Sequence, residues 1–331
     1  MFAIWFFAGL IGACLAGDSR LVTIGVISQP SSDPLKISYY NSKEQWSYVA
    51  GSYVDWIGTS GAMPVLIPFD LEQEKLDHIL ENIDGILFPG GGEPLRRADS
   101  VSKPTSYQLA MSYISDWAMR RNNQGKYFPI FATCLGFEGF VIAFSNNTLA
   151  LECDISDESI VHRLVPTSQF QKSPFWNGIG IEKAESVFKT KSIYYTHSCG
   201  IRTTSFNKNQ KLTENFNLLA TSTSRKGINF VASIEHTKYP FIGNQWHPEK
   251  NLYERSKSYD FVDRNRPVLD LSQRLIATFV KNIREKGNPK QLKDIDPTVR
   301  RYFKSRLVSD IMGMVVYERI YTFDEYNYPT N

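Results

Sequence analysis

One cysteine of this sequence stands between an apolar stretch and the start of a helix. Residues 128–133 read Phe-Pro-Ile-Phe-Ala-Thr, and Cys134, Leu135 and Gly136 follow directly. A tight turn from a strand into a helix exposes the side chain at its apex, and the positive end of the helix favours the nucleophilic thiolate. A lone cysteine is more often an inert core residue, so a catalytic role requires partners elsewhere. We predict that Cys134 is a nucleophile.

A histidine that could act as its base ends a later strand. Residues 241–249 read Phe-Ile-Gly-Asn-Gln-Trp-His-Pro-Glu. Side chains two residues apart in extended chain point to the same side, so Glu249 can fix the tautomer of His247 and leave the second ring nitrogen to face a thiol. The alternative is an ordinary surface turn. The other four histidines lack this context, and we predict that His247 is the base.

A third group of residues could stabilise an oxyanion. Acyl transfer to a thiol needs converging backbone donors for the negative oxygen. Residues 89–92 read Pro-Gly-Gly-Gly after a short apolar stretch, and the Leu135 amide follows the nucleophile directly. Glycine turns are common, so this motif has weight only beside the other two. We predict that Gly91 and Leu135 supply the donors.

The elements that would position these residues alternate along the first half of the chain. Strands are predicted at residues 21–28, 64–68, 85–88 and 127–133, and helices at 48–57, 71–83, 105–121 and 135–144. This alternation predicts an α/β fold with a mostly parallel sheet covered by helices on both faces. The loops that follow such strands meet at one edge of the sheet, where sites form.

The second half of the chain is less regular. Residues 146–217 are rich in Ser, Thr and Asn and predict an elaboration over the sheet edge. Strands are expected at 216–222, 228–234 and 241–245, and a helix at 268–286. We predict a catalytic domain at residues 18–288. Residues 289–331 are predicted as a tail that packs on this domain.

Composition excludes several classes of function. The chain has 331 residues, 42% of them hydrophobic, and a formal net charge of +3. That is enough apolar material for a core and too little positive charge to hold nucleic acid by phosphate contacts. The His, Cys and acidic residues show no cluster with metal-ligand spacing, so we predict neither a metal nor another cofactor.

The N-terminus predicts a secretory route. Residues 2–15 are apolar and uncharged, and small residues follow before the chain turns polar at Asp18. This pattern is typical of a signal peptide, here residues 1–17, although the start lacks a Lys or Arg. No later segment approaches the length of a membrane span. Asn146 begins a glycosylation sequon. We expect a lysosomal, vacuolar or extracellular protein, without membrane attachment once the signal is cleaved.

Taken together, these motifs resemble the class I glutamine amidotransferase-like superfamily and, within it, the gamma-glutamyl hydrolase family, which are peptidases of the Cys-His type. The resemblance runs from about residue 21 to residue 286. It is carried by Ile-Leu-Phe-Pro-Gly-Gly at 86–91 with Leu-Arg-Arg at 95–97, by Thr-Cys-Leu-Gly-Phe-Glu at 133–138, and by Gln-Trp-His-Pro-Glu-Lys at 245–250. The first predicted helix adds Ser-Tyr-Val at 52–54.

The resemblance implies a three-layer sandwich and a thiol hydrolase that cleaves γ-glutamyl amide bonds of folylpoly-γ-glutamates. It implies the nucleophile, the base and the oxyanion donors named above, with Glu249 as the third member of a triad. It also implies that Glu138 and His197 bind the substrate, and that the protein forms a homodimer.

Two departures and two alternatives belong beside this resemblance. Ala132 stands where many relatives have Gly, and His197 is followed by an unusual Ser-Cys-Gly run in which Cys199 could pair with Cys153. One alternative is a glutaminase that acts on other γ-glutamyl amides. The other is a relative that binds γ-glutamyl ligands without turnover, although the intact Cys134, His247 and Glu249 argue against it.

Overall fold

The computed structural model describes residues 20–31, 47–255, 259–300, 302, 306–309 and 319–323. The predicted signal peptide at residues 1–17 lies outside them. None of the described helices is both long and apolar enough to cross a membrane.

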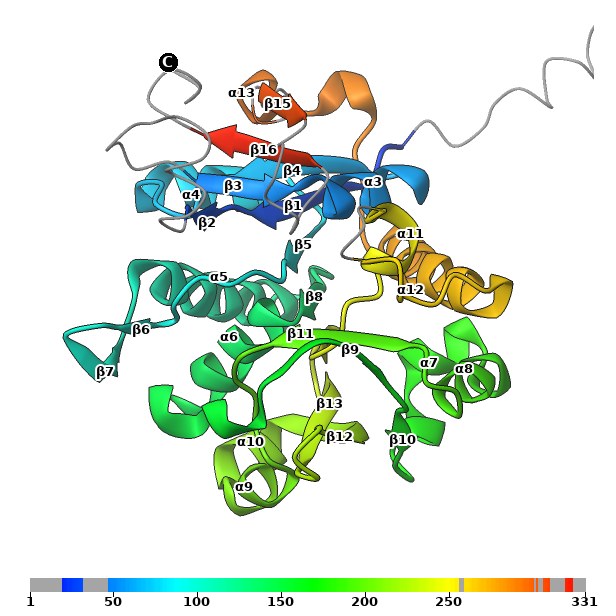
Figure 1. The fold of residues 1–331 in the computed structure, drawn as a ribbon. Helices are drawn as coiled ribbons and strands as arrows, with labels where there is room; N and C mark the ends of the chain where they lie inside the picture. Colours follow the sequence, from blue (N-terminus) through cyan, green and yellow to red (C-terminus); the bar gives the residue numbers. More distant parts are fainter. Residues whose placement is uncertain are drawn as a thin grey trace, which may run out of the picture.

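An eight-stranded sheet forms the centre of the fold (Figure 1), in the order β10-β12-β13-β14-β8-β5-β1-β4. Five strands run parallel: β1 (Thr23–Ile27), β4 (Met63–Ile67), β5 (Gly85–Phe88), β8 (Ile130–Thr133) and β14 (Phe241–Asn244). Three antiparallel strands extend one side: β13 (Asn229–His236), β12 (Phe216–Thr223) and β10 (Val165–Pro166). The predicted mostly parallel sheet is confirmed.

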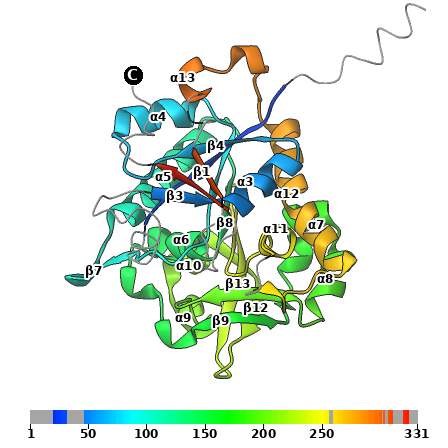
Figure 2. The same cartoon turned by 45° about the horizontal axis from the view of Figure 1, so that its top comes forward.

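Helices cover both faces of this sheet and enclose two separate cores (Figure 2). One core lies under α3 (Gly51–Thr59), α7 (Pro174–Ile179), α8 (Ile181–Phe188) and α12 (Arg266–Lys286). The other lies under α4 (Gln73–Glu81), α5 (Ser106–Asn123), α6 (Leu135–Ser145), α9 (Thr203–Lys208) and α10 (Gln210–Asn215). Because the sheet is buried from both sides, its parallel strands are continuous apolar stretches. The three-layer sandwich is confirmed.

A second sheet of four strands stands beside α3, in the order β15-β16-β3-β2. Its strands are β2 (Gln29–Pro30), β3 (Ser47–Ala50), β16 (Arg319–Phe323) and β15 (Arg306–Ser309). The predicted helix at 48–57 is therefore wrong at its start, because residues 47–50 pair with β16 and the helix begins only at Gly51. That pairing joins segments far apart in the sequence and overrides the local helical spacing.

The expected elaboration over the sheet edge contains more regular structure than its composition predicts. Within it, β9 (Asp157–His162) and β11 (Ile193–His197) form an antiparallel ribbon. Outside it, earlier in the chain, β6 (Arg96–Arg97) and β7 (Ser100–Pro104) form a small hairpin. Short helices complete the described chain: α11 (Lys250–Tyr253), α13 (Pro297–Arg300) and four 3-10 turns at Thr148–Ala150, Cys153–Ile155, Phe170–Lys172 and Leu292–Asp294.

Candidate active site

Cys134 occupies a strained turn between β8 and α6. Its backbone has φ 49° and ψ −108°, a conformation that non-glycine residues rarely adopt. Its amide donates a 2.7 Å hydrogen bond to the Asn244 carbonyl of β14, which holds the turn against the neighbouring strand. The next turn leaves no room for a side chain, because a methyl group on Gly136 would lie 2.3 Å from the Phe88 carbonyl oxygen. Ala132, two residues before Cys134, fits fully buried in the strand. The strained backbone of Cys134 is typical of functional sites.

The thiol of Cys134 holds its proton more strongly than its place at the start of a helix predicts. Burial, with the carboxylates of Glu138 and Glu249 nearby, raises the pKa of Cys134 well above its ordinary value. The cation of Lys250 and the Leu135 amide oppose this shift but do not overcome it. The start of α6 therefore does not hold a resting thiolate. A nucleophilic role for this sulfur therefore requires a base that takes its proton.

A buried carboxylate holds His247, the predicted base. Its Nδ1 lies 2.7 Å from Oε1 of Glu249, and both side chains are buried. Burial lowers the pKa of His247, whereas the attraction of His247 and Lys250 keeps the pKa of Glu249 low in spite of its own burial. The opposite nitrogen, Nε2, has no hydrogen-bond partner among the described residues.

The histidine ring and the cysteine meet across one glycine. A methyl group built on Gly90 would lie 2.5 Å from Cε1 of His247 and 3.0 Å from Cβ of Cys134. Sγ of Cys134 also lies 3.5 Å from the carbonyl oxygen of Thr196, which follows Tyr195 in β11. The structure therefore brings together the predicted nucleophile, the predicted base and the glycine turn, which follow three separate strands.

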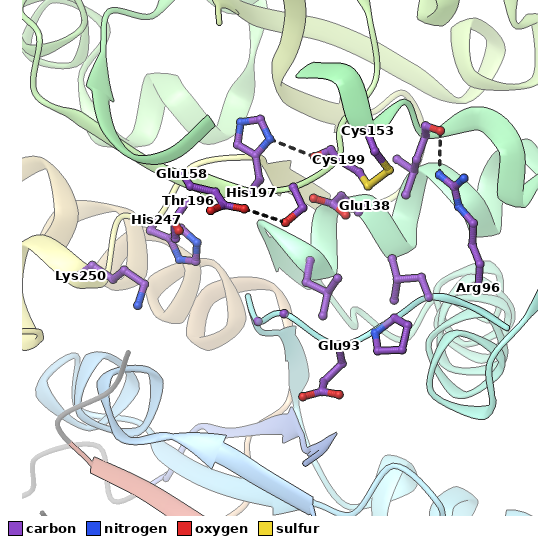
Figure 3. Close-up of a pocket in the computed structure, with 17 residues that line it drawn as sticks. Glu93, Arg96, Glu138, Cys153, Glu158, Thr196, His197, Cys199, His247 and Lys250 are labelled. Carbon is purple, nitrogen blue, oxygen red and sulfur yellow. Dashed lines mark hydrogen bonds between the residues drawn. A yellow bond between two sulfur atoms is a disulfide. The ribbon is translucent and has the colours of Figure 1, made fainter. Parts of the chain in front are cut away.

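A cavity of about 430 Å³ opens beside this cluster. Predicted site residues that line it are Gly91, Leu135, Glu138, His197 and His247. In Figure 3, His247 and Lys250 lie on one side of the cavity and Arg96 on the opposite side, with Glu138 between them. Glu249, which contacts Nδ1 of His247, is not among the residues that line the cavity. Asn146, the sequon residue, is exposed at the far end of α6.

The two predicted substrate-binding residues are both neutral at mildly acidic pH. Burial raises the pKa of Glu138 to about 8, although a 3.0 Å hydrogen bond from Nε2 of Gln245 and the charge of Arg96 oppose the shift. Burial lowers the pKa of His197 to about 4. Its Nδ1 lies 3.0 Å from the Cys199 carbonyl oxygen and so carries the proton. The cavity thus offers a carboxylic acid and an imidazole nitrogen that can accept a hydrogen bond.

Replacing Glu138 by Gln should raise the Tm more at pH 8 than at pH 4.5. The unfolded side chain ionises near 4.5, whereas the folded one keeps its proton to about pH 8. Wild type therefore loses stability as the pH rises between these values, because ionisation favours only the unfolded state. A Gln side chain does not titrate and escapes this loss.

Thermal unfolding of both proteins across this pH range makes the test. Glu214→Gln is the matched control, since the exposed Glu214 also accepts a hydrogen bond from a glutamine side chain but remains solvated by water. A gain in Tm from Glu138→Gln that is the same at both pH values would contradict the buried, protonated carboxyl.

Other residues complete the cavity wall, and one of them, Lys250, was assigned no role from the sequence. Cys153 and Cys199, whose pairing the sequence left open, form a disulfide and both line the cavity, close to His197. Lys250 also lines it, and its ammonium donates a 3.0 Å hydrogen bond to the Tyr259 hydroxyl. Tyr259 and nearby carboxylates raise the pKa of Lys250 although burial acts against this, so it remains a cation. Its position directly after Glu249 was the available signal.

Comparison with known proteins assigns this arrangement to a family. Residues 23–249 match the family model described as Peptidase C26. The chain belongs to the peptidase C26 family. Like this family's other members, it is therefore a hydrolase, as the Cys134 and His247 motifs predicted.

Curated relatives of this peptidase C26 chain span most of its length. It is 31% identical to "Gamma-glutamyl hydrolase" of Homo sapiens over 249 residues, which cover 73% of this chain and 72% of the relative. It is 28% identical to "Gamma-glutamyl hydrolase B" of Dictyostelium discoideum, with 81% and 73% covered. It is 27% identical to "Gamma-glutamyl hydrolase 1" of Arabidopsis thaliana, with 87% and 80% covered.

Proposed function

We propose that this chain hydrolyses the γ-glutamyl amide bonds of folylpoly-γ-glutamates through a thioester on Cys134. The observation that carries the proposal is the buried pair of His247 and Glu249 beside the strained Cys134, where His247 lines a cavity together with Arg96, Glu138 and Lys250. The names of the relatives support γ-glutamyl substrates. A cavity with Arg96 and Lys250 on opposite sides suits a chain of carboxylates.

The first half of the reaction forms the thioester. Nε2 of His247 takes the proton from Sγ of Cys134 as the sulfur attacks the γ-carbonyl carbon. The amides of Gly91 and Leu135 stabilise the negative oxygen of the tetrahedral intermediate. His247 then gives its proton to the leaving nitrogen, the C–N bond breaks, and a γ-glutamyl thioester remains.

The second half releases the product. Water attacks the thioester carbon while His247 takes one of its protons, and the same amides stabilise the second oxyanion. Collapse of this intermediate breaks the C–S bond and the thiol regains a proton from His247. Glu249 stabilises the imidazolium in both halves because its carboxylate faces Nδ1.

Chain shortening of pteroyl-penta-γ-glutamate by the purified protein tests the proposal. We expect shorter γ-glutamyl chains from wild type across acidic to neutral pH, and their lengths will separate endo from exo cleavage. Glutamine, offered in parallel, reports the glutaminase alternative. Binding of the substrate without shortening would favour the non-catalytic alternative and contradict the proposal.

Replacing Glu249 by Gln should lower kcat about 100-fold and change KM little. The amide keeps the size of the carboxylate but does not stabilise the imidazolium, and it can present its NH₂ group to Nδ1 and so favour the wrong tautomer. Steady-state kinetics measure the effect, and thermal unfolding shows whether the buried site stays folded. A kcat within threefold of wild type would remove Glu249 from the mechanism.

The disulfide supports the predicted secretory route. Disulfides persist in oxidising compartments and are rare in the cytosol, and Cys153 and Cys199 are paired in the wall of the cavity. Together with the apolar residues 2–15, this pairing is the basis on which we place the protein in the secretory pathway, as a lysosomal, vacuolar or extracellular enzyme.

A further inference from the structure

Two side chains from outside the glycine turn form hydrogen bonds with the backbone of Gly90, one with its carbonyl oxygen and one with its amide. Nε2 of Gln29, in β2, donates a 2.7 Å hydrogen bond to the Gly90 carbonyl oxygen. The hydroxyl of Tyr53, in α3, accepts a 2.7 Å hydrogen bond from the Gly90 amide. Gln29 and Tyr53 are at most 1% exposed, so water does not compete for either bond. The sequence gives neither residue an evident role.

Gln29 also fits against the next residue of the turn. A methyl group on Gly91 would lie 1.7 Å from Oε1 of Gln29 and 2.6 Å from its Nε2. The amide group of Gln29 therefore fills the space where any side chain at position 91 would lie. This contact fixes the place of the Gly91 backbone as well as that of the Gly90 carbonyl.

Planarity of the peptide bond converts this contact into an orientation. The Gly90 carbonyl and the Gly91 amide belong to one planar unit, and in a trans peptide they point in opposite directions. No cis peptide is present among the described residues. Because Gln29 holds the carbonyl oxygen on one side, the Gly91 N–H must point to the other, and Gly91 lines the cavity. A donor on the carbonyl also polarises the amide and strengthens its N–H as a donor.

We propose that Gln29 is a positioning residue that aims the Gly91 amide at the oxyanion, with Tyr53 holding the preceding peptide. The proposal rests on the hydrolytic function proposed above. Gln29 itself is placed by the second sheet, where it pairs with Tyr48 of β3, and Tyr48 in turn pairs with Thr322 of β16. Strands from the N-terminal and C-terminal parts of the chain thus hold Gln29 against the glycine turn beside Cys134.

The variant Gln29→Met tests this role because methionine keeps the shape and removes the donor. A misdirected oxyanion donor should lower kcat roughly 10- to 100-fold, with KM within about threefold of wild type. An N-acylated glutamate γ-semialdehyde is the second probe. Its aldehyde carbon adds the thiol of Cys134 to give a hemithioacetal, whose oxygen occupies the oxyanion position. Its inhibition constant should rise by about the same factor as kcat falls.

Gln108→Met is the matched control. Gln108 is also fully buried, and its Nε2 donates to a glycine carbonyl, that of Gly139, at 3.0 Å. It lies outside the cavity wall, so this variant should lose comparable stability and keep kcat within about twofold. Substrate affinity, measured in a Cys134→Ala background, should not change on adding Gln29→Met, because the oxyanion forms only during reaction.

A second variant, Gln29→Glu, keeps the test decisive if Gln29→Met does not fold. A protonated glutamic acid can still donate to the Gly90 carbonyl, whereas a carboxylate repels it. We expect kcat relative to wild type to be highest at low pH and to fall as the pH rises, a trend that a purely structural role does not produce.

The outcomes separate the two proposals. If wild type shortens the γ-glutamyl chain but Gln29→Met keeps its kcat and its affinity for the aldehyde, the positioning role is wrong and the hydrolase stands. The role is also wrong if Gln29→Met weakens substrate binding and leaves the ratio of aldehyde to substrate affinity unchanged. If wild type itself leaves the chain intact, the proposed function fails, and the role of Gln29 fails with it.

Discussion

Cys134→Ala should abolish turnover and leave the fold and the binding of substrate intact. The variant removes the sulfur on which the proposed thioester forms, so kcat should fall on the order of 10⁴-fold or more. Cys134 is the only free cysteine among the described residues, and no second thiol at the site can replace it. The measurement is the shortening of pteroyl-penta-γ-glutamate by the purified variant, followed for the time of many wild-type turnovers.

The same substitution should stabilise the strained turn only slightly, because alanine at φ 49° is still unfavourable. Thermal unfolding and equilibrium binding of the uncleaved substrate are the controls. Near-normal hydrolysis by a correctly folded Cys134→Ala variant would contradict the assignment of the nucleophile. Loss of binding together with turnover would show that the variant damages the cavity and would not support a nucleophile.

His247→Asn should lower kcat on the order of 10³-fold or more. The resting thiol is protonated because burial raises its pKa, so a reaction without the imidazole starts from the weaker nucleophile. The leaving nitrogen also loses its proton donor. Hydroxide can remove the thiol proton in place of the imidazole. The residual activity of His247→Asn should therefore increase as the pH rises into the alkaline range.

His236→Asn is the matched control for this variant. His236 is also buried and its Nδ1 is hydrogen-bonded, to the amides of Lys238 and Tyr239, but it lies outside the cavity wall. It should lose stability without a comparable loss of kcat. Equal losses of kcat from both histidine variants would indicate a general effect of opening the core and would remove His247 from its role as the base.

Local sequence predicted the parts of the site that local structure builds. The turn at Cys134 follows from an apolar strand that runs directly into a helix, and the pairing of His247 with Glu249 follows from their spacing in extended chain. The parallel sheet then brings both to one edge, as the alternation of strands and helices predicts. These features need no knowledge of distant contacts.

The remaining features depend on contacts between distant segments. The bond from Gln29 to Gly90 spans 61 residues, and the bond from Gly90 to Tyr53 spans 37. Neither leaves a pattern in the sequence around either partner. The expectation that the helix favours a thiolate at Cys134 was wrong for the same reason. Burial in a folded core, with Glu138 close by, raises the pKa of the thiol more than the local effect of the helix lowers it.

Partitioning of the intermediate between water and hydroxylamine tests the central claim most directly. Two γ-glutamyl substrates with the same acyl group and different leaving amines would be hydrolysed by wild type in the presence of hydroxylamine. If both pass through one thioester on Cys134, the ratio of γ-glutamyl hydroxamate to free acid will be the same for both substrates, whatever their rates. A ratio that depends on the leaving amine, or cleavage that gives no hydroxamate, would contradict the covalent mechanism.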